Sequence, residues 1–232
     1  AGEWRLIVPD MRGRGQSEYA RESSSYALPT YVADVVRLLH QLDTGPVVAI
    51  GTSMGGIIAM FLARAWPLAG AVLNDIGPEL EPAGLARIRD YVGQGRSFET
   101  WMHAARDLRE TLGAVHPDFE LADWLAMAKR LMCIGGNGRI VFDYDMKIAE
   151  ALSAPAEDAS GDLWQAFRAL AGKPMLIVRG ELSDLLSAAT VERMLAEAPG
   201  AEAVTVPRVG HPPTLDEPVA QAALARWLER IA

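Results

Sequence analysis

The stretch GTSMGG, residues 51–56, decides the fold of this chain of 232 residues. The apolar run PVVAI, residues 46–50, precedes it, and the apolar run IIAMFLA, residues 57–63, follows it. A buried strand therefore ends and a helix begins within a few residues. Gly-x-Ser-x-Gly in this context is typical of a nucleophile elbow, a sharp turn that lifts the hydroxyl of Ser53 clear of the sheet.

The turn places demands on the residues around Ser53. We expect it to be so tight that only residues without a Cβ fit two positions before and after the serine, at Gly51 and Gly55. The amide of Met54, at the helix N-terminus, is expected to form part of an oxyanion hole. A serine alone is a weak nucleophile, so this interpretation requires a base and an acid elsewhere in the chain.

A candidate base and a candidate acid follow strand-like runs further along the chain. His211 lies on a Gly/Pro loop after residues 203–206, and Asp184 lies in the loop after residues 175–179. Ligands of open parallel sheets bind at the carboxyl ends of the strands, where all three side chains would meet. We therefore expect His211 to take the proton of Ser53 and Asp184 to orient the imidazole.

These motifs resemble those of the α/β-hydrolase superfamily, in its serine-nucleophile branch, over the whole chain. Residues 9–17 look like the turn after the family's fourth strand, and residues 51–56 look like its elbow. Residues 180–184 and 210–211 are similar to its acid and histidine loops. The elbow is similar to those of lactonases, carboxylesterases, perhydrolases and carbon–carbon bond hydrolases.

The resemblance leaves alternatives for the acid. Family acids often lie three residues after the loop glycine, and that position is Ser183 here, whereas Asp184 is the fourth. We favour Asp184. Glu181, and Asp75 directly after the strand-like residues 71–74, are the alternatives.

Strand-like and helix-like runs alternate along both ends of the chain. The alternation predicts an α/β fold with a mostly parallel sheet and helices on both faces. The expected strands are 4–8, 46–50, 71–74, 175–179 and 203–206. The expected helices are 28–42, 54–66, 162–171, 187–198 and 216–231.

The alternation stops at Pro78. We expect residues 79–161 to be an inserted, mainly helical cap, flanked by an α/β-hydrolase core over residues 1–78 and 162–232. The Gly-rich residues 135–138 within it are either a hinge or a loop.

Aromatic side chains of the insert are candidates for binding substrate. Trp101, Trp124 and Tyr144 belong to a set of large apolar side chains that could line a pocket. The alternative is that such residues pack the core of the cap itself.

The chain enters the resemblance at the family's fourth strand. The family normally has three earlier strands and a His-Gly loop that provides a second oxyanion donor. Without the third strand, residues 4–8 and 46–50 would flank a position with unpaired backbone groups, which is costly. We therefore expect that N-terminal strands of the fold are missing from these residues and that a functional form carries ~50 or more additional ones.

The composition argues against several classes of function. The net charge of −8 argues against nucleic acid and acidic membrane surfaces as partners, and no apolar run approaches the ~20 residues that cross a bilayer. The single cysteine, Cys133, excludes an internal disulfide and fits a cytoplasmic location. We find no zinc-ligand spacing, phosphate-binding loop or dinucleotide fingerprint, so we expect no cofactor and no metal.

Together these patterns predict a serine hydrolase that cleaves a small ester, lactone or thioester through an acyl-enzyme. A carbon–carbon bond hydrolase or a perhydrolase would use the same three residues. A non-catalytic small-molecule receptor that uses a pocket under the cap is the alternative from another class. The presence of Ser53, Asp184 and His211 together argues against a receptor, because binding alone would not need all three.

Overall fold

The computed structural model describes residues 4–153 and 163–231. They belong to two compact units, which are described here one at a time. The first comprises Ala1–Ile7, Ala27–Leu85 and Pro155–Ala232, and the second comprises Val8–Tyr26 and Ala86–Ala154. No helix of the described residues combines the length and the apolar character needed to cross a bilayer.

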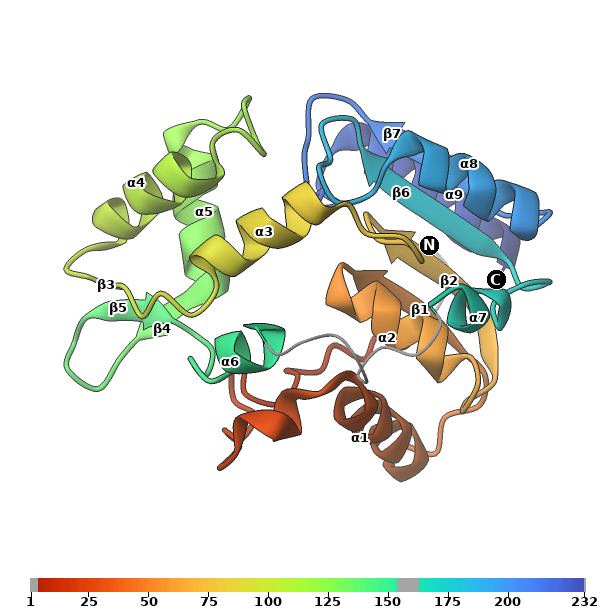
Figure 1. Cartoon of the computed structure of the whole chain (residues 1–232), viewed down its shortest axis with the longest axis horizontal. Helices are drawn as coiled ribbons and strands as arrows, with labels where there is room; N and C mark the ends of the chain where they lie inside the picture. The colour runs from red at the N-terminus through yellow and green to blue at the C-terminus, as the bar shows by residue number, and fades with distance from the viewer. Residues whose placement is uncertain (1–3, 154–162, 232) are drawn as a thin grey trace. The chain divides into compact units, whose positions relative to one another are not determined.

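The first unit contains a four-stranded parallel sheet in the order β1-β2-β6-β7 (Figure 1). Its strands are β1 (Val47–Thr52), β2 (Leu68–Asn74), β6 (Met175–Gly180) and β7 (Glu202–Val206). Register pairs Thr52 with Asn74 and Gly180 with Val206, so the carboxyl ends of the strands share one edge. The expected α/β class with a parallel sheet is confirmed.

Helices cover both faces of this sheet. Side chains alternate between the two faces along a strand. On β2, Val72 packs in a cluster with Trp227 of α9 (Pro218–Ile231), whereas Leu73 lies beside Gly56 of α2 (Met54–Leu62). The other helices that lie wholly in this unit are α1 (Leu28–Gln41), α7 (Leu163–Arg168) and α8 (Ala188–Glu197), and all five correspond to expected helices.

One expected strand is wrong. Residues 4–8 have no strand conformation, and Leu6 and Val8 are 80% and 90% exposed. Among the described residues β1 pairs with β2 alone, and Ile50 on β1 is 47% exposed. A segment without a neighbouring strand gains no ladder hydrogen bonds, so its β-prone residues do not form a strand.

The second unit has its own small core. Helices α4 and α5 pack against each other. A three-stranded antiparallel sheet in the order β3-β5-β4 contributes side chains to the same hydrophobic cluster. The elements of this unit are η1 (Ser23–Tyr26), β3 (Ser97–Phe98), α4 (Trp101–Leu112), α5 (Leu121–Leu131), β4 (Met132–Ile134), β5 (Ile140–Phe142) and α6 (Ile148–Ser153). The remaining helix, α3 (Pro82–Tyr91), crosses the division between the two units. The small sheet was not expected from the sequence.

The Gly-rich residues 135–138 form the turn between β4 and β5. The amide of Gly135 donates to the carbonyl of Arg139 at 2.8 Å, and Gly138 has a φ of +75°. A turn with a residue in this left-handed region fits an antiparallel hairpin. Of the two alternatives raised by the sequence, this is the loop.

The boundaries of the second unit differ from the expected insert of residues 79–161. The main segment of the unit starts at Ala86 and not at residue 79. The unit also includes Val8–Tyr26, a segment that sequence reasoning placed in the core. The hydroxyl of Tyr26 donates to Asp145 Oδ2 at 2.6 Å in a buried contact, and the Gly15 amide donates to the Asp143 carbonyl. These contacts join residues more than 100 positions apart, which local patterns do not reveal.

Candidate active site

Ser53 occupies the turn between β1 and α2. It is the N-cap residue of the helix and has φ 51° and ψ −120°. A non-glycine residue in this region of φ is strained, and such strain gathers at functional sites. The amide of Ser53 donates to the carbonyl of Asn74 at 3.0 Å, which holds the turn against the end of β2. The geometry is that of the elbow expected from the sequence.

Two positions at this turn have no room for a Cβ, one because of backbone and one because of a side chain, and the first was predicted. A Cβ on Gly51 would lie 2.3 Å from the backbone of Gly55, and a Cβ on Gly56 would lie 2.3 Å from Ile76 Cγ2. A Cβ on Gly55 itself would meet no atom within 4 Å. The expectation was therefore right for Gly51 and wrong for Gly55, because the close contact at Gly55 is made by its backbone.

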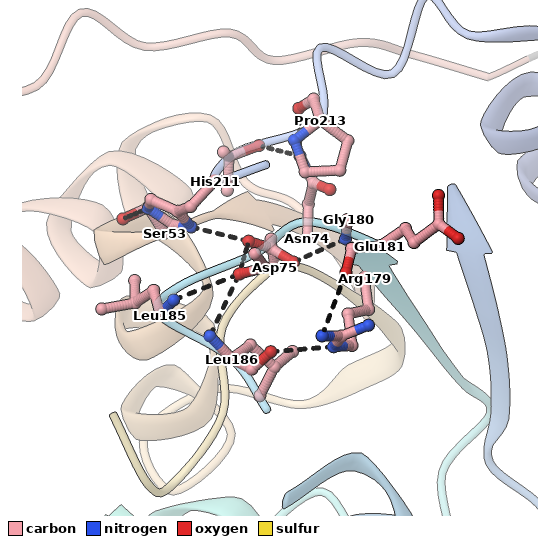
Figure 2. Close-up of polar contacts among 12 residues, drawn as sticks. Ser53, Asn74, Asp75, Arg179, Gly180, Glu181, Leu185, Leu186, His211 and Pro213 are labelled. Carbon is pink, nitrogen blue, oxygen red and sulfur yellow. Dashed lines mark hydrogen bonds and ion pairs between the residues drawn. The ribbon is translucent and has the colours of Figure 1, made fainter. Parts of the chain in front are cut away.

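His211 contacts Ser53 through one ring nitrogen and an acid through the other (Figure 2). Its Nε2 lies 3.0 Å from Ser53 Oγ, and its Nδ1 lies 2.8 Å from Asp75 Oδ2. His211 is 3% exposed and Asp75 is fully buried. The carboxylate hydrogen-bonded to His211 is therefore that of Asp75, the alternative acid, and not that of Asp184, which the sequence favoured.

The backbone directs Asp75 toward the histidine. Asp75 follows the last residue of β2 and has a φ of 54°. Its amide donates to the carbonyl of Val178 at 2.7 Å, which keeps it paired with β6. Its Oδ1 accepts from the amide of Gly180 at 2.7 Å, and its Oδ2 accepts from the hydroxyl of Ser183 at 2.6 Å. The carboxylate is thus fixed from three directions, and hydrogen bonds to a charged group are the stronger ones.

The two acidic residues of the loop after β6 make other contacts. Glu181 Oε2 accepts from the amide of Arg208 at 2.7 Å, and Arg208 has a φ of 56°. Glu181 therefore holds the turn that precedes His211. Asp184 is half-buried, and its carbonyl accepts from the amide of Gly84 at 3.0 Å.

Asn74 joins the three segments that carry the site, and sequence reasoning missed it. This buried side chain donates through Nδ2 to Thr52 Oγ1 at 3.0 Å and to the carbonyl of Pro213 at 2.8 Å. Thr52 precedes Ser53, and Pro213 lies two residues after His211. A polar residue ending an otherwise apolar strand was the one available signal.

Arg179 closes the loop after β6. Its Nε donates to the carbonyl of Leu186 at 2.8 Å, and its second guanidinium nitrogen donates to the carbonyl of Glu181 at 3.4 Å (Figure 2). One side chain thus holds both ends of a loop whose middle contacts Asp75.

Met54 supplies the first amide of α2. The first amides of a helix have no partner within the helix and carry the positive end of its dipole. Its part in an oxyanion hole stays a prediction.

The aromatic candidates of the second unit have different surroundings. Trp124 is 1% exposed and packs in the core of that unit, so it is not available to a substrate and the expectation for it is wrong. Trp101 is half-buried against the same cluster. The hydroxyl of Tyr144 accepts from the amide of Gly93 at 3.0 Å.

Among the residues placed in the structure, no three His, Cys, Asp or Glu side chains gather as metal ligands would. Cys133 is half-buried in the second unit. Burial raises the pKa of its thiol, and a hydrogen bond with Asp143 raises that pKa further. The thiol therefore stays protonated at neutral pH and is a poor nucleophile.

Comparison with known proteins shows the family of this chain. Residues 1–224 match the alpha/beta hydrolase family. The chain belongs to that family. A crystal structure of an alpha/beta hydrolase from Novosphingobium aromaticivorans is similar to this alpha/beta hydrolase with a TM-score of 0.93. The two are 55% identical, and the match covers 99% of this chain and 81% of that one.

Two sequence relatives of this alpha/beta hydrolase carry names for an activity. The 3-hydroxybutyrate-oligomer hydrolase of Cupriavidus necator is 37% identical over 233 residues, covering 97% of this chain and 78% of that protein. The 2-(acetamidomethylene)succinate hydrolase of Mesorhizobium japonicum is 27% identical over 210 residues, covering 88% of this chain and 71% of that protein. Family and relatives together support a general hydrolase activity.

Proposed function

We propose that this alpha/beta hydrolase is a serine hydrolase that cleaves small esters through an acyl-enzyme. The supporting observation is the chain of contacts from Ser53 Oγ through both ring nitrogens of His211 to Asp75, at 3.0 and 2.8 Å. A nucleophile, a base and an orienting acid in this arrangement have the geometry that activates a serine hydroxyl.

Each residue has a defined role in the proposed reaction. Ser53 Oγ attacks the carbonyl carbon of the ester while His211 Nε2 takes the hydroxyl proton. The imidazolium then gives that proton to the departing alcohol oxygen as the ester C–O bond breaks, which leaves an acylated Ser53. Water attacks the acyl carbon, again with His211 as the base; the imidazolium then returns the proton to Ser53 Oγ as the acyl C–Oγ bond breaks and the acid is released. Asp75 holds the Nδ1–H tautomer and stabilises the imidazolium in both halves.

The amide of Met54 is the proposed donor to the oxyanion of the tetrahedral intermediate. Its place at the start of α2 adds the positive end of the helix dipole to the hydrogen bond. One such donor contributes about 10²–10³ in turnover in comparable sites.

The relatives favour an ester as the substrate. The relative that is 37% identical is named for hydrolysing 3-hydroxybutyrate oligomers, and hydroxy acids joined head to tail are linked by ester bonds. We therefore take the dimer of 3-hydroxybutyrate as the first substrate to test. Carbon–carbon bond cleavage would use the same three residues, so a vinylogous diketone serves as the competing substrate.

Active-site labelling tests the proposal. A fluorophosphonate should add one phosphonyl group to the protein, on Ser53 by peptide mass spectrometry. Ser53→Ala should abolish labelling and lower turnover of the dimer by roughly 10⁴–10⁶, because the three residues act as a unit. Substantial ester hydrolysis by Ser53→Ala would contradict the mechanism. Turnover of the diketone but not the dimer would contradict the ester assignment, and ligand binding without turnover or labelling would favour the receptor.

A further inference from the structure

Glu217 lies directly before α9 and contacts the segment that follows His211. Its Oε1 accepts from the amide of Thr214 at 2.8 Å and from the hydroxyl of Thr214 at 3.0 Å. Its own carbonyl accepts from the amide of Gln221 at 2.9 Å, which joins Glu217 to the helix. Thr214 is the third residue after His211, and the proposed reaction steps give Glu217 no role.

The peptide group between Pro213 and Thr214 is held from both sides. Its carbonyl oxygen accepts from Asn74 Nδ2 at 2.8 Å, and its N–H donates to Glu217. A peptide group is planar, and in its trans form the C=O and the N–H point in opposite directions. Two partners on opposite sides therefore fix the rotation of this plane, close to His211 in the chain.

The helix that follows Glu217 is anchored in the core. Ala223 and Trp227 of α9 are buried in one cluster with Val206 and Val209, which belong to the segment leading to the histidine. Groups held on a rigid helix are positioned more precisely than groups on a loop. The carboxylate of Glu217 can therefore act as a fixed point for the loop it contacts.

The segment that carries His211 has a left-handed residue near each end. Arg208 has a φ of 56° and Leu215 has a φ of 65°, and non-glycine residues in this region are strained. The amide of Arg208 donates to Glu181 at 2.7 Å. The amide of the residue before Leu215 donates to Glu217. Glu181 is exposed, whereas Glu217 is half-buried and its second oxygen is buried, so water competes less for the hydrogen bonds of Glu217.

We propose that Glu217 is a positioning residue for His211. By fixing the peptide group between Pro213 and Thr214, it holds the loop that places the imidazole against Ser53. The inference rests on the proposed function. The alternative is a role only in starting α9, because a glutamate that reaches back three residues to a threonine is also typical of a capping box. The two roles differ in one respect: a cap affects stability, and a positioning residue also affects turnover by the folded enzyme.

Removal of the Glu217 carboxylate tests the positioning role. Glu217→Ala should lower kcat and the fluorophosphonate labelling rate about tenfold, the effect of losing one hydrogen bond to a charged group. KM should stay nearly unchanged, because the substitution displaces the base and not the ester. Glu217→Gln keeps an oxygen that can accept from the Thr214 amide and should restore most of both rates. A loss that Glu217→Gln fails to restore would overturn the proposal.

Glu217→Asp separates positioning from helix capping. Aspartate keeps a negative charge at the N-terminus of α9, which favours the helix, but its side chain is one methylene shorter and does not reach the Thr214 amide. We expect a melting temperature close to that of the wild type and a kcat as low as that of Glu217→Ala. This variant also serves if Glu217→Ala does not fold. A folded Glu217→Ala or Glu217→Asp with the kcat of the wild type would overturn the positioning role.

Ser187 provides a matched control at the start of another helix. Its hydroxyl caps α8 by accepting from the amide of Thr190 at 3.2 Å. Ser187→Ala should lower the melting temperature and leave kcat unchanged. A kcat loss in Ser187→Ala as large as that in Glu217→Ala would mean that any lost cap slows the enzyme, which would overturn a specific role for Glu217.

A double-mutant cycle tests the route through the peptide group. Asn74→Ala removes the partner on the other side of that group and should also lower kcat. If both side chains act by fixing one plane, the loss in the double variant should be clearly smaller than the product of the single losses. Losses that multiply would show that Asn74 and Glu217 act independently, and would overturn this route.

The labelling measurements keep the inference separate from the proposed function. Labelling of the wild type by the fluorophosphonate reports on the proposed function, whereas ratios of labelling rates between variants report on Glu217. A wild type that is not labelled would contradict the proposed function. A labelled wild type, with the same rate in folded Glu217→Ala, would contradict the inference alone.

Discussion

The loops after β2 and β6 end at the same edge of the sheet and contribute differently to the site. The loop after β2 supplies the acid with its first residue, Asp75, which three hydrogen bonds and a left-handed backbone hold in place. The loop after β6 contains the acidic residues Glu181 and Asp184, yet the contacts to Asp75 come from the amide of Gly180, the last residue of β6, and from the hydroxyl of Ser183 in the loop. The segment after β2 thus provides the carboxylate that contacts His211, and the end of β6 with its loop provides the hydrogen-bond donors that orient this carboxylate.

Exchanging the two candidate acids for amides should give the largest contrast between these loops. Asp75→Asn should lower kcat about 10⁴-fold, because the amide oxygen would stay on the Gly180 amide and the NH2 group would face His211 Nδ1, which favours the wrong tautomer. Asp184→Asn should lower it less than about tenfold by the same reasoning. Steady-state hydrolysis of the 3-hydroxybutyrate dimer, the substrate proposed for testing, measures both.

One outcome would contradict the assignment of Asp75 as the acid. If Asp184→Asn were the crippling change and Asp75→Asn retained turnover, the acid would belong to the loop after β6. Circular dichroism of both variants separates loss of activity from loss of fold.

Gly180→Ala should have an intermediate effect on stability and on the labelling rate, because the amide of Gly180 donates to Asp75. A Cβ at this position would lie 2.5 Å from the carbonyl oxygen of Val209 and 2.6 Å from that of Gly210, and backbone atoms cannot swing aside as a side-chain end does. We expect a loss of about 1–3 kcal/mol in the free energy of unfolding, typical of overpacking, together with a slower labelling rate as the amide leaves Asp75.

Gly45 is the control for that substitution, because a Cβ there would meet no atom within 4 Å. Gly45→Ala should match the wild type in thermal unfolding and in labelling. If Gly180→Ala were as stable and as reactive as the wild type, the end of β6 would tolerate displacement by the added Cβ.

Glu181→Gln should have the smallest effect. The glutamine keeps a side-chain oxygen that can accept from the amide of Arg208, and Glu181 is exposed. We expect stability within about 0.5 kcal/mol of the wild type and kcat within about twofold, measured by denaturant unfolding and ester turnover. A loss of about a hundredfold would mean that the charge of Glu181 acts on His211 directly.

The sequence predicted what local patterns encode. The apolar runs before and after Ser53 gave β1 and α2, and the loop after β7 gave the histidine. It missed Asp75 as the favoured acid because its selection depends on a φ of 54° and on a contact with Ser183, 108 positions away. Neither is visible in residue type or spacing.

Long-range contacts also explain the other misses. Residues 4–8 have the composition of a strand, but strand formation depends on a neighbour. Val8–Tyr26 joins the second unit through contacts such as Tyr26 with Asp145, 119 positions away. Trp124 was a candidate for the pocket, with packing in the core of the insert as the alternative, and it lies in that core; sequence alone does not separate a core side chain from a pocket side chain.

The hydrogen bonds of Arg179 determine when the loop after β6 loses its conformational entropy. By holding the carbonyls of Glu181 and Leu186 together, its guanidinium orders the intervening loop when the chain folds. The free energy needed to restrict that loop is then spent once, at folding, and not again in each catalytic cycle. Hydrogen exchange should report this as slow exchange of the Leu185 and Leu186 amides before any ligand is added, because both already donate to Ser183.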